Sequence, residues 1–202
     1  GRRMFARGEI NYEEFMEMVS SSAPSIGHCN TMGTATSMNS LAEALGMSLT
    51  GCAAIPAPYR ERAQMAYDTG LRSVQLVEQD IKPTDIMTRK AFQNAIVTAS
   101  AIGASTNAPP HIIAIAKHLN INLTLDDWEK WGEEIPLLVN LQPAGEHLGE
   151  GFFQAGGVPV VMKELAKQNK INNGAMTVTG KTVAENLTNT KKTENEIIKN
   201  YE

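Results

Sequence analysis

The spacing of apolar and polar positions along the chain predicts mainly helices. Apolar residues recur every three or four positions in several windows, and capping residues or glycines bound these windows. The predicted helices cover approximately residues 12–19, 34–45, 58–69, 71–79, 89–102, 110–119, 124–131, 157–167 and 180–187. Gly70 is predicted to separate two of them, and the second of the two is expected to bury Val74, Leu76 and Val77.

Two short apolar runs, 136–141 and 175–178, are the strand candidates. Together with the helices they predict an α/β fold, a helix-rich layered domain around a small, mostly parallel sheet. Residues 1–187 are expected to form this domain. Residues 188–202 are expected to be a polar linker or tail, because 188–196 lacks apolar periodicity.

Composition narrows the class of protein. The formal net charge of −4 argues against nucleic acid or an anionic membrane as the main partner. No apolar run approaches the length of a membrane span, and no signal peptide is recognisable. Two cysteines are too few for a disulfide framework, so a reducing, cytoplasmic setting is expected. The chain begins at Gly1 without a methionine, which suggests a piece of a longer protein.

One loop, residues 23–33, presents a single cysteine immediately before a predicted helix. Ser25, Gly27, Thr31 and Gly33 are small residues that let a backbone approach a ligand closely. A thiol near a helix N-terminus has a lower pKa than an unperturbed one, and the thiolate it forms is a better metal ligand. The alternative is that Cys29 is a structural cysteine on a tight turn, the commoner role for a lone cysteine.

A second loop, residues 103–110, places Ser105, Thr106 and Asn107 directly before a helix that starts with Pro109. These side chains could form an elaborate N-cap, or they could bind a hydroxylated or anionic ligand at the helix start. Spacing alone leaves both interpretations open. Three charged residues at 60–62 could likewise bind an acidic substrate, although charges on a first helical turn are usually solvated.

The usual catalytic signatures are absent from the sequence. It contains no phosphate-binding glycine motif, no Cys-x-x-Cys pair, no His-Glu-x-x-His and no Gly-x-Ser-x-Gly. Cys29 and Cys52 lie in separate predicted elements, and two thiolates alone complete no common metal site. Residue-level reasoning therefore leads to an α/β domain with two polar loops at helix starts.

Four ordered segments resemble the dihydroxy-acid and phosphogluconate dehydratase family. They are Gly-His-Cys-Asn-Thr-Met-Gly-Thr-Ala with Glu-Ala-Leu-Gly-Met (27–35 and 43–47), Gly-Ala-Ser-Thr-Asn-Ala (103–108), Gly-Gly-Val-Pro (156–159) and Val-Thr-Gly-Lys-Thr-Val (178–183). The Gly-His-Cys form and the Ala-Ala-Ile-Pro-Ala run at 53–57 look most like the branch that dehydrates sugar acids such as arabinonate or xylonate.

The resemblance implies an iron–sulfur hydro-lyase that converts an aldonate to a 2-keto-3-deoxy acid, and the iron–sulfur-bearing N-terminal type of domain. A cluster iron would act as a Lewis acid, a 2Fe–2S cluster being favoured over 4Fe–4S, while Mg²⁺ would bind the substrate carboxylate and a serine alkoxide would take the C2 proton. Cys29 matches a cluster ligand, whereas Cys52 matches none. Ser105, Thr106 and Asn107 match the family's polar loop, which implies a substrate-side or a structural role. Family members are usually homo-oligomers.

Departures from the family pattern limit this expectation. Two family segments are missing: the upstream Cys-Asp-Lys segment and the downstream Thr-Asp-Gly-Arg-x-Ser segment, which carries the catalytic serine. In addition, Asn30 replaces the residue that the family pattern has directly after the cysteine. The chain is therefore expected to be an internal fragment, inactive alone, without the C-terminal barrel domain. The alternatives are a dihydroxy-acid dehydratase of branched-chain amino acid synthesis and a degenerate, non-catalytic module that binds sugar acids.

Overall fold

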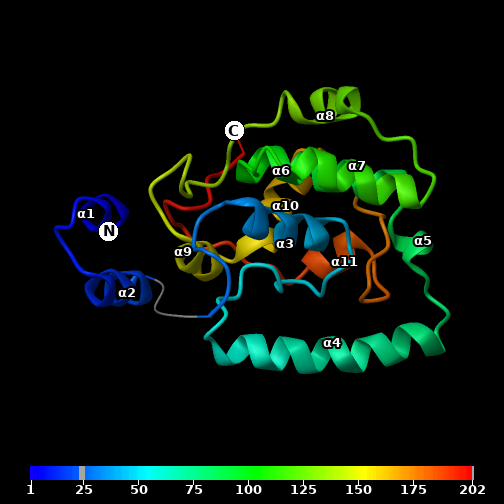
Figure 1. Cartoon of the computed structure of the whole chain (residues 1–202). Helices are drawn as coiled ribbons and strands as arrows, with labels where there is room; N and C mark the ends of the chain where they lie inside the picture. The colour runs from blue at the N-terminus through cyan, green and yellow to red at the C-terminus, as the bar shows by residue number, and fades with distance from the viewer. Residues whose placement is uncertain (23–25, 202) are drawn as a thin grey trace.

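The computed structural model describes residues 1–22 and 26–201. Its helices follow the chain from the N-terminal pair to the short last helix (Figure 1). They are α1 Arg2–Ala6, α2 Tyr12–Ser21, α3 Thr34–Ala44, α4 Arg60–Glu78, α5 Pro83–Ile86, α6 Arg89–Ile102, α7 Ala108–His118, α8 Leu125–Gly132, α9 Gly149–Gln154, α10 Gly157–Lys167 and α11 Val183–Leu187.

Helix α6 is the centre of the hydrophobic core. Helices α3, α7, α8 and α10 pack against it, and Figure 1 shows α3 and α10 beneath it. Phe92 and Ile96 of α6, Leu41 of α3, Ile112 of α7 and Leu165 of α10 are 0–1% exposed. The predicted helix 89–102 is confirmed, with Thr88 as its N-cap and Gly103 in the left-handed conformation after its end.

The predicted sheet is not found in the described residues. The two strand candidates take part only in isolated β-bridges, which are Val139 with Ile198, Leu141 with His147, and Met176 with Thr182. The first run instead satisfies its backbone against helix ends and loops. The Leu138 amide donates to the carbonyl of Ala101 at the end of α6, at 2.8 Å. A run of four to six apolar residues buried between helices has the same sequence pattern as a buried strand, which explains the error.

Helix α4 corrects a second expectation, because it runs unbroken through Gly70 where two helices were predicted. A glycine stops a helix when it adopts the left-handed conformation, and Gly70 does not. The inward side of α4 is continuous across this point, since Met65, Arg72 and Leu76 are all partly buried against the body. Val74 and Val77 point outward instead and are 60% and 81% exposed.

The C-terminal segment returns to the core. Ile198, in the part expected to be a linker or tail, is 0% exposed and bridges to Val139. The Lys199 amide donates to the carbonyl of Leu138 at 2.8 Å. Glu164 of α10, itself buried, accepts hydrogen bonds from Lys167 and from the Tyr201 amide. Residues 197–201 are thereby packed onto the helical domain.

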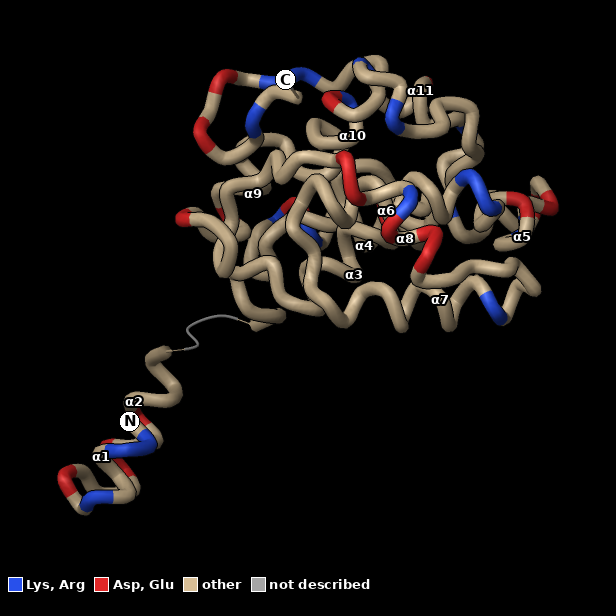
Figure 2. The backbone as a smooth tube through the Cα atoms, turned by 90° about the horizontal axis from the view of Figure 1, so that it is seen from above, with Lys and Arg blue, Asp and Glu red and all other residues tan. Residues whose placement is uncertain are grey.

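The N-terminal helices α1 and α2 form a small hairpin that stands apart from the helical body (Figures 1 and 2). They pack through Phe5 and Phe15, whose ring centroids lie 5.2 Å apart. Asn11 is the N-cap of α2, and its side chain and that of Glu14 form a reciprocal capping box. Figure 2 shows Lys and Arg interspersed with Asp and Glu over the helical body. In the described part of the chain, no helix is both long and apolar enough to cross a bilayer.

Candidate functional site

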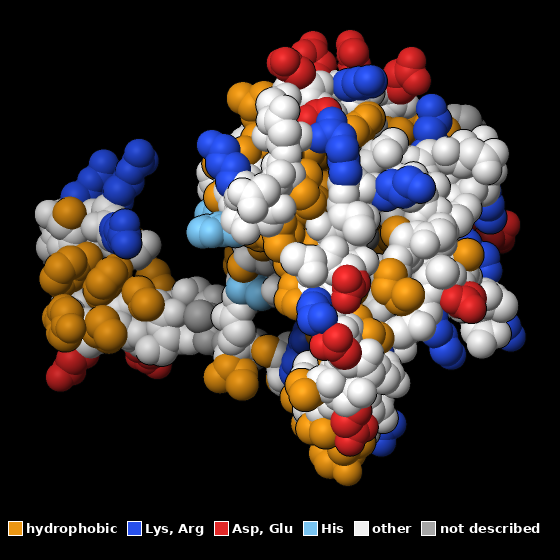
Figure 3. Space-filling view, turned by 90° about the vertical axis from the view of Figure 1, so that its right-hand side faces the viewer, with side chains coloured by type: hydrophobic (Ala, Val, Ile, Leu, Met, Phe, Trp, Pro, Cys, Tyr) orange, Lys and Arg blue, Asp and Glu red, His pale blue; other side chains and the backbone are white. Residues whose placement is uncertain are grey.

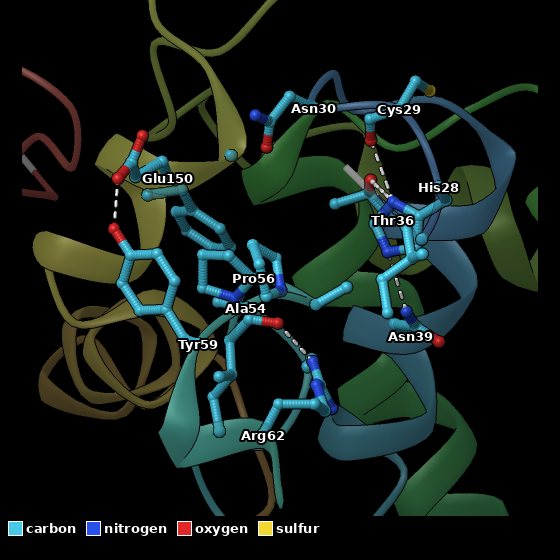
Figure 4. A pocket seen from close by; sticks show the side chains of 18 of the residues that line it. His28, Cys29, Asn30, Thr36, Asn39, Ala54, Pro56, Tyr59, Arg62 and Glu150 are labelled. Carbon is cyan, nitrogen blue, oxygen red and sulfur yellow. Dashed lines mark hydrogen bonds between the residues drawn. The ribbon is translucent and has the colours of Figure 1, made fainter. Parts of the chain in front are cut away.

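A cavity of about 650 Å³ opens where the cysteine loop meets the segment before α4. The cysteine loop and α3 form one side of it, and Tyr59, Arg62 and Glu150 of α9 lie across from them (Figure 4). Its lining comprises Ser22, Ile26, Gly27, His28, Cys29, Asn30, Thr36, Asn39, residues 53–59, Arg62, Gly149, Glu150 and Phe152. Cys29, the predicted ligand, thus lines this cavity.

Cys29 presents an exposed thiol whose pKa is lowered by its neighbours. A hydrogen bond from the Thr31 hydroxyl, 3.5 Å from Sγ, and one from the Thr31 backbone lower the pKa of the thiol below its ordinary value. A Cβ placed on Gly33, the N-cap of α3, would lie 3.7 Å from this Sγ, so the thiol is close to the helix start as predicted. Ser25, the other small residue singled out in this loop, lies outside the described residues.

His28 ties the loop to α3. Its Nδ1 lies 2.8 Å from the carbonyl oxygen of Cys29, and its Nε2 lies 3.1 Å from Nδ2 of Asn39 (Figure 4). A neutral ring with its proton on Nδ1 satisfies both contacts, donating to the carbonyl and accepting from the amide. The Thr36 hydroxyl adds a bond to the carbonyl of Thr31 at 2.7 Å. These contacts hold the backbone on both sides of Cys29.

The wall opposite Cys29 is held from two sides by charged groups. The carboxylate of Glu43 accepts from the Gly51 amide at 2.6 Å and from the Ala53 amide at 2.8 Å. Arg62 donates to the Ile55 carbonyl and lies 3.5 Å from Sγ of Cys52. Burial raises the pKa of Glu43 to about 7, although both amides and the Arg62 charge act against that rise.

The loop and this wall touch at one glycine. Gly27 has φ +106°, and a Cβ there would lie 2.7 Å from the Cβ of Ala57. Only glycine combines that conformation with such close contact. The close backbone approach expected of the small residues in this loop is therefore found, and it is made to the cavity wall.

The charged residues 60–62 have different fates. The side chain of Arg60 is 94% exposed and lies beside Glu61, as solvated charges on a first turn do. Arg62 is partly buried and lines the cavity. Just before α4, the Tyr59 hydroxyl donates to Glu150, a contact that raises the pKa of Tyr59, and its ring stands edge-on to Phe153.

The second predicted loop adjoins the cysteine loop but does not line the cavity. The hydroxyl oxygens of Ser105 and Thr34 lie 3.2 Å apart, and the side-chain amide of Asn107 donates to the Thr34 hydroxyl at 2.9 Å. Ser37 of α3 accepts the Ser105 backbone amide at 2.8 Å. Thr106 is exposed and faces a separate, shallower hollow of about 270 Å³ that includes Ser105. Two of the three side chains thus join the loop to the first turn of α3.

The site fits part of a metal centre. Cys29 meets the requirements of a single ligand, since its thiol is exposed and acidified. Within residues 1–22 and 26–201, no three His, Cys, Asp or Glu side chains gather as a metal-binding group. The sulfur of Cys52 is instead engaged with Arg62. The described residues therefore supply one thiolate and not a complete ligand set.

Several residues of the site were not predicted from the sequence. His28, Asn39, Glu43 and Glu150 carry most of its polar contacts, and none was assigned a role beforehand. Glu43 lies three residues after Ser40 and seven after Thr36, both buried on the same face of α3. This spacing was the available signal, but a glutamate among small polar residues resembles a solvated face rather than a buried one.

The site is a cysteine with a lowered pKa beside a cavity that is lined by apolar side chains and a few hydrogen-bonding ones. A helical domain carries this site, and comparison with known proteins identifies the domain. The model of the dihydroxy-acid/6-phosphogluconate dehydratase N-terminal domain matches residues 1–186. The chain therefore belongs to the dihydroxy-acid/6-phosphogluconate dehydratase family, as the ordered motifs predicted.

Relatives among characterised proteins carry dehydratase names. The chain is 57% identical over 200 residues to a D-xylonate dehydratase of Caulobacter vibrioides, covering 99% of this chain and 33% of that protein. It is 48% identical over 180 residues to an L-arabinonate dehydratase of Rhizobium leguminosarum bv. trifolii, covering 89% and 31%. A dihydroxy-acid dehydratase of Acetivibrio thermocellus is 42% identical over 198 residues, covering 98% and 36%. The chain thus spans about a third of the length of these relatives.

Proposed function

We propose that this chain is the cysteine-bearing part of a sugar-acid dehydratase, which eliminates water from an aldonate to form a 2-keto-3-deoxy acid. The observation that carries the proposal is the 57% identity to the D-xylonate dehydratase over nearly the whole chain. The cavity agrees with it, because a hollow lined mainly by apolar side chains, with a few hydrogen-bonding groups and Cys29 at its edge, is the usual form of a small-molecule site.

In this proposal Cys29 is one ligand of an iron–sulfur cluster. When bound, the cluster supplies a Lewis-acidic iron for the departing hydroxyl group. The residues of this chain prepare its attachment. Thr31 stabilises the thiolate. His28 bonds to the carbonyl of Cys29 through one ring nitrogen and to Asn39 of α3 through the other, so it links the loop to that helix. The remaining cluster ligands, the Mg²⁺ site and the serine base are proposed to come from other parts of the complete protein.

Ser105, Thr106 and Asn107 have a supporting role in this scheme. Ser105 and Asn107 bond to Thr34, which is the first residue of the helix that follows the cysteine loop. We therefore propose that they act on substrate binding indirectly, by fixing the position of α3. The complete protein is further proposed to be a cytoplasmic homo-oligomer, as the resemblance implies.

The test uses the complete gene product that contains this chain, reconstituted with iron and sulfide under anaerobic conditions. D-xylonate and L-arabinonate are expected to yield 2-keto acids. Cys29→Ser is expected to lose most of the bound iron and at least about 100-fold in rate, the scale of a lost metal-site contact. Cys52→Ser is the matched control and should keep both. Full iron content and turnover in the Cys29→Ser protein would overturn the assignment.

A dihydroxy-acid dehydratase is the second candidate, favoured by the 42% identity to the Acetivibrio protein. Rates on pentonates and on dihydroxyisovalerate, measured side by side, separate the two. A higher kcat/KM on dihydroxyisovalerate would replace the sugar-acid assignment. Saturable binding of sugar acids without iron or turnover would instead identify a non-catalytic module.

A further inference from the structure

Glu43 is a buried acid that has no part in the proposed function so far. Acidic side chains normally stay on the surface, and Figure 3 shows several of them on one face of the molecule. In the part of the chain that the structure describes, the buried acids are Glu43 and Glu164, which are 7% and 3% exposed. Glu164 accepts a hydrogen bond from the Lys167 ammonium at 2.6 Å, which balances its charge. Glu43 is bonded to two backbone amides instead.

These two amides belong to the loop that leads into the cavity wall. The Gly51 amide donates to Oε1 of Glu43 at 2.6 Å, and the Ala53 amide donates to Oε2 at 2.8 Å. An ionised carboxylate accepts fully at both oxygens, whereas protonation turns one oxygen into a hydroxyl, which accepts less well. Residues 53–59, which follow directly, line the cavity, whereas Glu43 does not. The charge of Glu43 therefore acts on the cavity through its wall.

Helix α3 connects this wall to the cysteine loop. Near the start of α3, the Thr36 hydroxyl donates to the Thr31 carbonyl at 2.7 Å, and the Asn39 side chain lies 3.1 Å from the His28 ring (Figure 4). Glu43 is one residue before the end of the same helix. Because an α-helix has a fixed rise per residue, side chains of one rigid element set the separation of the two sides of the cavity.

The surroundings of Glu43 contain one cation. Arg62 of α4 is the charged group that acts on it, and the guanidinium also holds the Ile55 carbonyl and lies 3.5 Å from the thiol sulfur of Cys52. Toward α10 and α11, Glu43 borders a small hollow that is otherwise lined by uncharged side chains. Burial outweighs the amides and Arg62, and it raises the pKa of Glu43 to about 7. Glu43 therefore changes its charge close to neutral pH.

We propose that Glu43 is a positioning residue for substrate binding, whose ionised carboxylate holds the cavity wall at residues 51–55 in the form that accepts the substrate. Protonation loosens one of the two amide contacts, so the wall shifts and the substrate binds less tightly. Glu43 touches no substrate and acts only through the wall. This inference rests on the proposed dehydratase function and adds a pH-dependent control of its cavity.

Steady-state kinetics of the complete, reconstituted gene product test the proposal. The substrate is D-xylonate or dihydroxyisovalerate, whichever the protein turns over faster, and KM and kcat are measured from pH 6 to pH 8.5. Glu43→Gln keeps the size of the side chain but offers only one acceptor oxygen at every pH. The two proteins are expected to have similar KM values at pH 6, and wild-type KM is expected to be about 10-fold lower at pH 8.5, with kcat nearly unchanged.

Glu164→Gln is the matched control, because Glu164 is also a buried glutamate that accepts a backbone amide, that of Tyr201. It lies on α10 and does not line the cavity. Its replacement is expected to leave the dependence of KM on pH as in the wild type. The same change of the KM profile in both variants would overturn the proposal, since any loss of a buried carboxylate would then suffice.

Nuclear magnetic resonance of the ¹⁵N-labelled chain tests the loop contact independently of activity. The amide signals of Gly51 and Ala53 are expected to shift with a midpoint near pH 7 in the wild type and to stay constant in Glu43→Gln. Amides that titrate while the two proteins keep one KM ratio at every pH would overturn the positioning role. Turnover of neither acid would instead overturn the dehydratase proposal and the inference that rests on it, and the amide titration distinguishes this failure from the first.

Discussion

At the scale of single residues, Glu43 shows how an ordinary side chain acquires an unusual role. Its carboxylate is buried beneath the cavity wall and accepts two backbone amides, those of Gly51 and Ala53. The Arg62 guanidinium is the charged group facing it. Burial outweighs these stabilising contacts and raises its pKa to about 7. A proton is therefore held by the folded chain at a pH where the unfolded chain has released it.

This difference makes a prediction for stability. Between the ordinary value of 4.5 and about 7, the folded state binds one more proton than the unfolded state, so the free energy of unfolding falls as pH rises through this window. The wild type is expected to lose about 3 kcal/mol between pH 4.5 and pH 7.5 relative to Glu43→Gln, which cannot titrate. Urea unfolding of both proteins across that range measures it. Parallel pH profiles would contradict the assigned burial effect.

At the scale of elements, the caps of the helices were predictable, whereas the extent of α4 was not. Asn11, Thr88 and Thr124 are residue types that favour the N-cap position, and each is the N-cap of a helix in the structure. Capping depends on residues within one turn, so a sequence contains the necessary information. The continuity of α4 through Gly70 depends on distant partners, among them the Val178 carbonyl that Arg72 reaches. The same distant contacts turn Val74 outward.

Gly70 accordingly weakens a helix that tertiary contacts hold together. Gly70→Ala is expected to raise the free energy of unfolding by about 0.5–1 kcal/mol, because alanine loses less backbone entropy and its Cβ has open space. Gly51→Ala is the contrasting control. Its Cβ also has open space, but Gly51 has φ +83°, so alanine there should destabilise the chain by about 1 kcal/mol. Urea unfolding at one low protein concentration compares the two.

At the scale of the whole molecule, the C-terminal segment closes the domain. Residues 188–202 were expected to be a polar linker or tail, yet Ile198 within them is fully buried and bridges to Val139. The backbone of the apolar run at 136–141 finds part of its hydrogen bonding there. One buried isoleucine in a polar stretch has no periodicity, so only the folded chain reveals it.

Removing this anchor should destabilise the whole domain. Ile198→Ala is expected to lower the free energy of unfolding by about 2–4 kcal/mol, through lost burial and the cavity left behind. Lys199→Ala, which truncates an exposed neighbour, is expected to change it by less than about 0.5 kcal/mol. Chemical denaturation measures both. Equal stability of the two variants would mean that residues 197–201 do not hold the core.

The sequence by itself determined the helices with local caps, the cysteine loop at the start of α3 and membership of the dehydratase family. These features depend on nearby residues or on motifs in a fixed order, which can be recognised in the sequence without knowledge of the fold. Tertiary structure alone decided that the apolar runs form no sheet in the described residues, and that Arg62 turns inward while Arg60 stays in water. It also decided that Glu43 is buried and that Val74 and Val77 of α4 point outward. Each of these depends on which distant backbone groups and side chains become neighbours. The local sequence pattern does not determine those contacts.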